Sequence, residues 1–61
     1  MDVKNKRVVV TGAASGIGKA LCEAFHQAEA KTVIAVDINL EGAQDTADSV
    51  NGIAVQANVG N

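Results

Sequence analysis

The sequence lacks tyrosine, tryptophan and proline altogether, and phenylalanine, cysteine and histidine occur once each in its 61 residues. Without a tyrosine, no reaction that needs a phenol as general acid or base can run on these residues alone. The single cysteine, Cys22, excludes an internal disulfide and fits a reducing compartment. One cysteine and one histidine (His26) do not provide the ligand spacing of a zinc site. The sequence therefore predicts neither a disulfide scaffold nor a metal centre.

The chain also lacks an excess of positive charge and a long apolar run. Its formal net charge is −2 at pH 7, whereas nucleic-acid binding calls for a basic surface. No apolar stretch approaches the roughly 20 residues that cross a bilayer, and the N-terminus has no apolar core typical of a secretory leader. We therefore expect one small cytoplasmic domain that binds neither nucleic acid nor membranes.

The chain does contain a regular alternation of apolar runs and amphipathic segments. Consecutive apolar residues suit parallel strands that are buried on both faces, and apolar residues at helical spacing suit amphipathic helices. The pattern predicts strands at 6–10, 31–36 and 53–57 and helices at 17–28 and 40–49. The two expected apolar stripes comprise Ile17, Leu21, Ala24, Phe25 and Ala28 on the first helix, with Cys22 at its flank, and Leu40, Ala43, Ala47 and Val50 on the second.

The resulting order β-α-β-α-β predicts a parallel sheet. Because strand–helix–strand crossovers are right-handed, two successive crossovers place both helices on one face of the sheet and give the strand order 3-2-1. This arrangement is half of a doubly wound α/β fold. Its other face is left bare and lined by valine and isoleucine. We therefore expect residues 1–61 to be part of a larger domain.

The turn between the first strand and the first helix is rich in glycine and suits a phosphate. Gly12 allows a sharp turn, Gly16 lets the backbone approach a pyrophosphate, and Gly18 lets the helix pack closely. The N–H groups of Ser15, Gly16 and Ile17 then face the phosphate oxygens at a helix N-terminus, and the Ser15 hydroxyl adds a further group. The alternative is a glycine-rich turn without a ligand.

Asp37 ends the second strand, nineteen residues after Gly18. A carboxylate at this place accepts hydrogen bonds from the adenosine ribose hydroxyls of a dinucleotide, and it would repel a 2′-phosphate. The glycine loop contains no lysine or arginine, and Ile38 follows Asp37. The sequence therefore favours NAD over NADP. The alternative is a solvated aspartate at a strand end.

With the pattern Thr-Gly-x-x-x-Gly-x-Gly at 11–18 and Asp37 both present, the chain resembles the N-terminal segment of the short-chain dehydrogenase/reductase family. The resemblance implies a Rossmann fold and a homo-oligomeric parent enzyme that transfers hydride between NAD and a carbonyl or secondary alcohol. It also implies cofactor contacts from Gly12, Ser15, Ile17 and Asp37, with Gly16 and Gly18 shaping the loop.

The chain departs from the family pattern at two places. Asn58-Val59 stands where the family has an Asp-Val pair that reads the adenine, and asparagine keeps an acceptor oxygen for the adenine amino group. Glu29 stands where the family commonly has glycine at the end of the first helix. If that backbone is left-handed, a residue other than glycine costs about 1 kcal/mol.

The family's catalytic groups, a Ser and a Tyr-x-x-x-Lys pair, are not present in these residues, so the sequence predicts no catalytic residue here. His26 is expected on the solvated side of its helix. One alternative is a stand-alone nucleotide-binding module without catalysis. Another is a different Rossmann-type enzyme such as a methyltransferase, whose glycine loop usually lacks this spacing. The residues contain no information about the substrate.

Overall fold

The computed structural model describes residues 3–57. Three strands and two helices alternate along the chain, in the predicted order and within one residue of the predicted bounds at each end. They are β1 (Arg7–Thr11), α1 (Gly16–Gln27), β2 (Thr32–Asp37), α2 (Leu40–Ser49) and β3 (Ile53–Gln56). Asn39 caps the N-terminus of α2, since its Oδ1 accepts the N–H of Gly42 at 3.1 Å.

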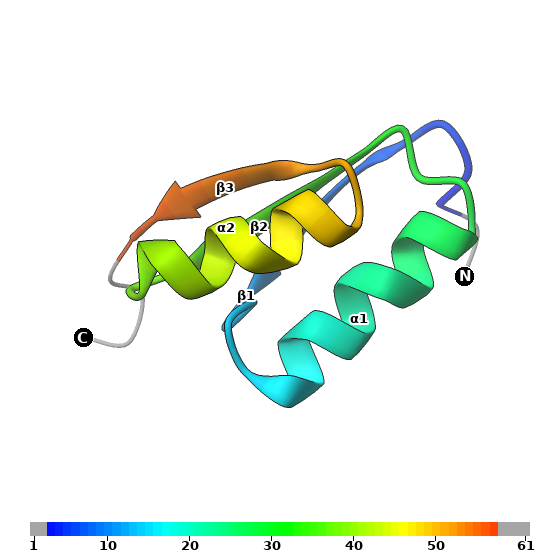
Figure 1. Cartoon of the computed structure of the whole chain (residues 1–61). Helices are drawn as coiled ribbons and strands as arrows, with labels where there is room; N and C mark the ends of the chain where they lie inside the picture. The colour runs from blue at the N-terminus through cyan, green and yellow to red at the C-terminus, as the bar shows by residue number, and fades with distance from the viewer. Residues whose placement is uncertain (1–2, 58–61) are drawn as a thin grey trace.

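The strands form a parallel sheet in which β2 lies between β1 and β3. This is the predicted order 3-2-1, and it places the three carboxyl ends of the strands along one edge of the sheet. In Figure 1 the start of α2 and the end of β3 lie on the left, and the glycine-rich turn that follows β1 lies below them. The fold thus gathers three loops at one edge.

Both helices cover the same face of the sheet (Figure 1), as two right-handed crossovers require. The core between them consists of small and medium side chains: Val10, Ala13, Cys22, Val33, Ala35, Ala43, Ala47 and Val50. Such a core is thin, because alanine and valine side chains allow the helices to lie close to the strands.

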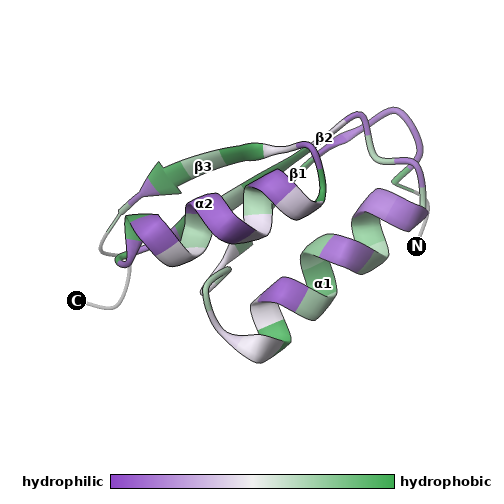
Figure 2. Ribbon diagram, in the orientation of Figure 1, coloured by the Kyte–Doolittle hydropathy of each residue, from purple (hydrophilic) through white to green (hydrophobic). Residues whose placement is uncertain are grey.

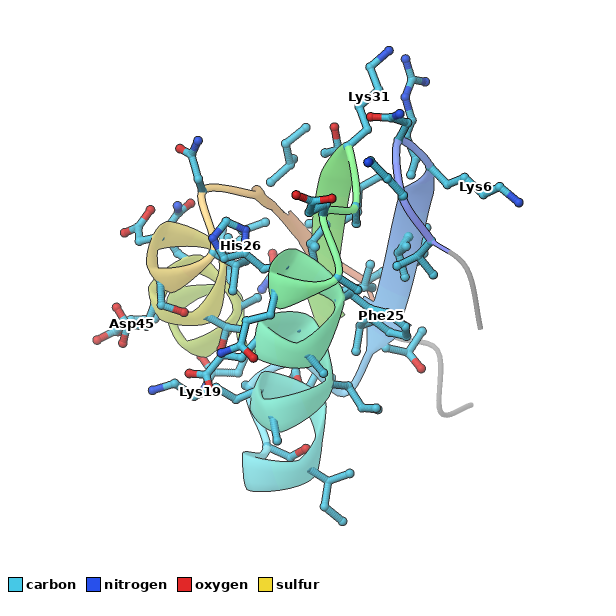
Figure 3. All side chains as sticks on the ribbon, turned by 90° about the vertical axis from the view of Figure 1, so that its right-hand side faces the viewer. Lys6, Lys19, Phe25, His26, Lys31 and Asp45 are labelled. Carbon is cyan, nitrogen blue, oxygen red and sulfur yellow. The ribbon has the colours of Figure 1, made fainter. Side chains whose placement is uncertain are left out.

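The predicted apolar stripe of α1 is wrong in its orientation. The helix buries Gly18 and Cys22, whereas Ile17 is 79% and Leu21 46% exposed. Phe25 is partly buried against the core on the side of α1 away from α2 (Figure 3). The residues that face inward, Gly18 and Cys22, are small and permit a close approach to the chain beneath, whereas Ile17 and Leu21 remain on the outer side.

The predicted apolar stripe of α2 is mostly confirmed, except that one predicted residue is exposed and one residue that was not predicted is buried. Ala43 and Ala47 are buried and Val50 packs with them, but Leu40 is exposed at the first turn. A polar residue, Thr46, is buried in the same stripe. Its position three residues after Ala43 fits the helical period.

Both helices end in a Schellman motif that uses a left-handed residue other than glycine. Glu29 has a φ of 67° and Asn51 a φ of 55°. The N–H of Ala30 donates to the carbonyl of Phe25 at 3.1 Å, and that of Gly52 donates to Ala47 at 2.8 Å. The left-handed backbone expected at Glu29 is therefore present. The cost of about 1 kcal/mol applies more to Glu29 than to Asn51, because asparagine tolerates this conformation better.

The second face of the sheet is open. Paired residues Val9, Ile34 and Ile53 form one row on this face, and Val9 and Ile53 are 61% and 54% exposed. Figure 2 shows that β3, at the edge of the sheet, is mostly hydrophobic. Neither described helix is long and apolar enough to cross a bilayer.

Candidate functional site

The glycine-rich turn lies between the end of β1 and the first turn of α1. Gly12 has a φ of 69°, a conformation that favours glycine, so the sharp turn predicted here is present. A Cβ on Gly18 would lie 2.0 Å from the carbonyl oxygen of Gly12. Gly18 is therefore required because the helix folds back on the loop itself, rather than because it packs on the strands.

Gly16 differs from the other two glycines, since a Cβ there would meet no atom within 4 Å. The protein itself does not need a glycine at this position. The space beside it is open, and no side chain stands in the way of a group that approaches the backbone there. The approach of a pyrophosphate to Gly16 stays a prediction.

The Ser15 side chain holds the loop together. Its hydroxyl donates to the Gly12 carbonyl at 2.7 Å and accepts the Gly18 N–H at 3.0 Å, so it caps α1. The Ser15 N–H also donates to Gly12, at 3.0 Å. Of the three predicted phosphate donors, the N–H groups of Gly16 and Ile17 are left, because the first amides of a helix have no acceptor within it.

Asp37 connects the end of β2 to the glycine loop. One carboxylate oxygen accepts the Ala14 N–H and the other accepts the Asn39 N–H, both at 2.9 Å. These two backbone donors, first Asn39 and then Ala14, lower the pKa of Asp37 below its ordinary value. The carboxylate is therefore charged at neutral pH, and it is fixed at the edge where the loop and α2 meet.

Thr46 is a part of this arrangement that the sequence analysis missed. Its hydroxyl donates to the Ala13 carbonyl at 2.9 Å, and the bond is buried. Ala13 in turn donates its N–H to Val36 in β2 at 3.1 Å. A polar residue inside the apolar stripe of a helix was the available signal, because a buried hydroxyl needs a partner.

Three other polar side chains lie away from the loop. Lys6 and Lys31 are at the opposite end of the sheet, and His26 is near the end of α1 (Figure 3). A small cavity of about 80 Å³ at that end is lined in part by His26, Lys31 and Asn51, and it contains none of the predicted site residues. Burial raises the pKa of the Cys22 thiol, as expected for an inert packed cysteine.

No cluster of metal-ligating side chains exists among residues 3–57. The predicted adenine contacts, Asn58 and Val59, lie outside the described residues. The described site thus consists of the loop amides, the open space at Gly16 and the Asp37 carboxylate.

The chain matches known short-chain dehydrogenases. The model of the short chain dehydrogenase family matches residues 6–60. The chain belongs to the short-chain dehydrogenase family. It is 48% identical over 50 residues to the short-chain dehydrogenase anuF of Penicillium roqueforti (strain FM164), an alignment that covers 82% of this chain and 18% of that protein.

Two solved structures share the fold of this family segment. A short chain dehydrogenase/reductase from Burkholderia phymatum in complex with NAD superposes with a TM-score of 0.88 and 26% identity, over 100% of this chain and 23% of that one. A structure described as ribose-5-phosphate isomerase from Brucella melitensis 16M gives a TM-score of 0.89 and 35% identity, over 98% and 23% of the two chains.

The short-chain dehydrogenase segment is much shorter than its curated relatives. It spans 7% to 21% of the length of four of them. These proteins therefore contain large regions that have no counterpart in residues 1–61.

Proposed function

We propose that the chain binds NAD as the cofactor segment of a short-chain oxidoreductase. The observation that carries the proposal is the Asp37 carboxylate, joined to the glycine loop by the 2.9 Å bond from Ala14. In the proposed complex the amides of Gly16 and Ile17 hold the pyrophosphate, and Asp37 accepts the ribose hydroxyls. Gly12, Ser15 and Gly18 keep the loop in shape.

The charges near the site support NAD rather than NADP. Asp37 and Glu41 bring negative charge to the start of α2. Basic residues Lys4, Lys6, Arg7 and Lys31 precede or begin the strands, and Figure 3 shows Lys6 and Lys31 far from the loop. A 2′-phosphate beside Asp37 would be repelled by the carboxylate, and the remaining basic residue, Lys19, belongs to α1 rather than to the loop or to β2. Asn58 and Val59 remain the proposed adenine contacts.

The open sheet face supports the further proposal that residues 1–61 form one part of a larger domain. Valine and isoleucine on that face are exposed, and the relatives are several times longer. In such a complete enzyme, bound NAD would exchange a hydride with a carbonyl or a secondary alcohol. The residues that polarise that substrate would come from outside this segment.

Titration with NAD, followed by two-dimensional NMR of the ¹⁵N-labelled chain, tests the proposal. We expect the amide signals of Gly16 and Ile17 to shift, and NADP to bind at least about tenfold more weakly because of the repulsion at Asp37. Gly16→Val should abolish the shifts without unfolding, because its side chain would occupy the open space.

His26→Ala is the matched control, since His26 is exposed and lies near the far end of α1 (Figure 3). It should bind NAD like the unchanged chain. Folded protein that gives no shifts at millimolar NAD would contradict the proposal. A dispersed spectrum from a monomer that binds NAD unaided would favour the stand-alone module over the larger domain.

A further inference from the structure

The peptide group between Ala13 and Ala14 is held at both of its ends. Thr46 Oγ1 donates to the carbonyl oxygen of Ala13 at 2.9 Å, and the N–H of Ala14 donates to Oδ2 of Asp37 at 2.9 Å. These two atoms belong to one planar unit. A hydrogen bond that fixes the direction of the carbonyl therefore fixes the direction of the N–H as well.

Thr46 is placed for this role by α2. Its side chain is buried, and so is Ala13. One turn earlier on the same helix face, a Cβ on Gly42 would lie 2.6 Å from the Cβ of Ala14. The absence of a side chain at Gly42 thus lets α2 approach the loop closely enough for the Thr46 hydroxyl to reach it.

The direction of the Thr46 hydroxyl is unusual for a threonine inside a helix. Such hydroxyls commonly bond to the carbonyl three or four residues earlier in their own helix. Here the hydroxyl donates across to the glycine loop, 33 residues away in the sequence. A valine would fill the same volume but could not orient the peptide.

We propose that Thr46 is a positioning residue for the dinucleotide site, which acts through the Ala13–Ala14 peptide to hold the Asp37 carboxylate where it meets the ribose. The inference rests on the proposed function and deepens it. It assigns the choice between NAD and NADP to a chain of contacts from Thr46 through the peptide to Asp37, rather than to Asp37 alone.

Two pairs of variants that differ in one hydroxyl test the inference: Thr46 against Thr46→Val, and Thr46→Ser against Thr46→Ala. Each is titrated with NAD and with NADP. The quantity compared is the dissociation constant for NADP divided by that for NAD. A partly unfolded sample weakens both ligands equally, so this ratio responds to the site and not to stability. We expect the ratio to fall about tenfold in Thr46→Val and Thr46→Ala, roughly the effect of one lost hydrogen bond, and to stay within about twofold in Thr46→Ser.

The ¹³C signal of the Asp37 carboxylate, titrated without any nucleotide, gives a second readout. Loss of the Ala14 bond should raise the pKa of Asp37 toward its ordinary value in Thr46→Val, while the bond from Asn39 remains. Thr46→Ser should keep the low pKa. This measurement stands even if the chain binds no dinucleotide, so failure of the proposed function and failure of the inference are distinguishable.

Equal ratios of dissociation constants and equal Asp37 pKa values within both pairs would overturn the inference. The proposal that the chain binds NAD would still stand after that result. If Thr46→Val does not fold, the Ser and Ala pair decides in the same way. The positioning role would be supported if either readout changes in both pairs when the hydroxyl is removed, and stays the same when only the methyl group is removed in Thr46→Ser.

Discussion

The two faces of the sheet differ in the size of their side chains and in what covers them. The helix-covered face carries Val10, Val33 and Ala35, which pack against Cys22 of α1 and Ala47 of α2. The open face carries Val9, Ile34 and Ile53, paired in one row. The residues on the covered face are buried, whereas Val9 and Ile53 on the open face are exposed and Ile34 between them is partly buried.

This difference shows where the candidate site gets its geometry. The glycine loop is anchored on the covered side: Ala13 is part of the core and bonds to Thr46, and Gly18 folds against Gly12. Close approach of the helices sets the position of the loop. Side chains that enlarge or hydrate the covered face should thus disturb the site, and changes on the open face should not.

Gly18→Ala should have the largest effect. The new Cβ would lie 2.0 Å from the backbone oxygen of Gly12, and neither atom can move without displacing the loop. We expect a loss of about 3 kcal/mol or more in the free energy of unfolding, which is most of the stability of a chain this small. Urea unfolding followed by circular dichroism measures it.

Gly16→Ala makes the same substitution two residues before Gly18 and is the matched control for Gly18→Ala. Its Cβ meets no atom within 4 Å, so the free energy of unfolding should change by less than about 1 kcal/mol. Equal losses in the two variants would show that the loop does not fold back on Gly12 as described.

Val33→Thr tests the covered face within the sheet. Val33 is 2% exposed, and threonine has nearly the same shape, so the change mainly introduces a buried hydroxyl. We expect a loss of about 2 kcal/mol in the free energy of unfolding. A shift of the urea midpoint with an unchanged slope measures this loss. A neutral result would mean that the hydroxyl finds water or a partner, and that the core beneath the helices is less tightly packed than the structure indicates.

The element order, the parallel topology and the loop glycines could be predicted from the sequence because they depend on local signals. Runs of valine, a helix period and glycine spacing are all visible within a few residues. The bond from Ala14 to Asp37 joins residues 23 positions apart, so only their shared sheet edge could be predicted. The roles expected for Asn58 and Val59 stay predictions.

The face of α1 could not be predicted in the same way. Hydrophobicity favours Ile17 and Leu21 as core residues, whereas the helix buries Gly18 and Cys22. The deciding factor is how close the helix must lie to the loop and β1, which is a property of the tertiary structure. The same closeness makes Thr46 a partner of Ala13, and this contact lay beyond what periodicity alone indicates.

Ile53→Thr should have the smallest effect and tests the open face. Ile53 is 54% exposed, and threonine keeps the β-branched shape that suits a strand. We expect the free energy of unfolding to change by less than about 0.5 kcal/mol, and self-association to fall because apolar surface is removed. Urea unfolding and sedimentation velocity measure these quantities. A loss as large as that of Val33→Thr would contradict the comparison, because it would mean that Ile53 is covered in solution. If the same substitution is neutral in the 61-residue chain but costly in a longer chain that includes it, the added segment is what covers this face.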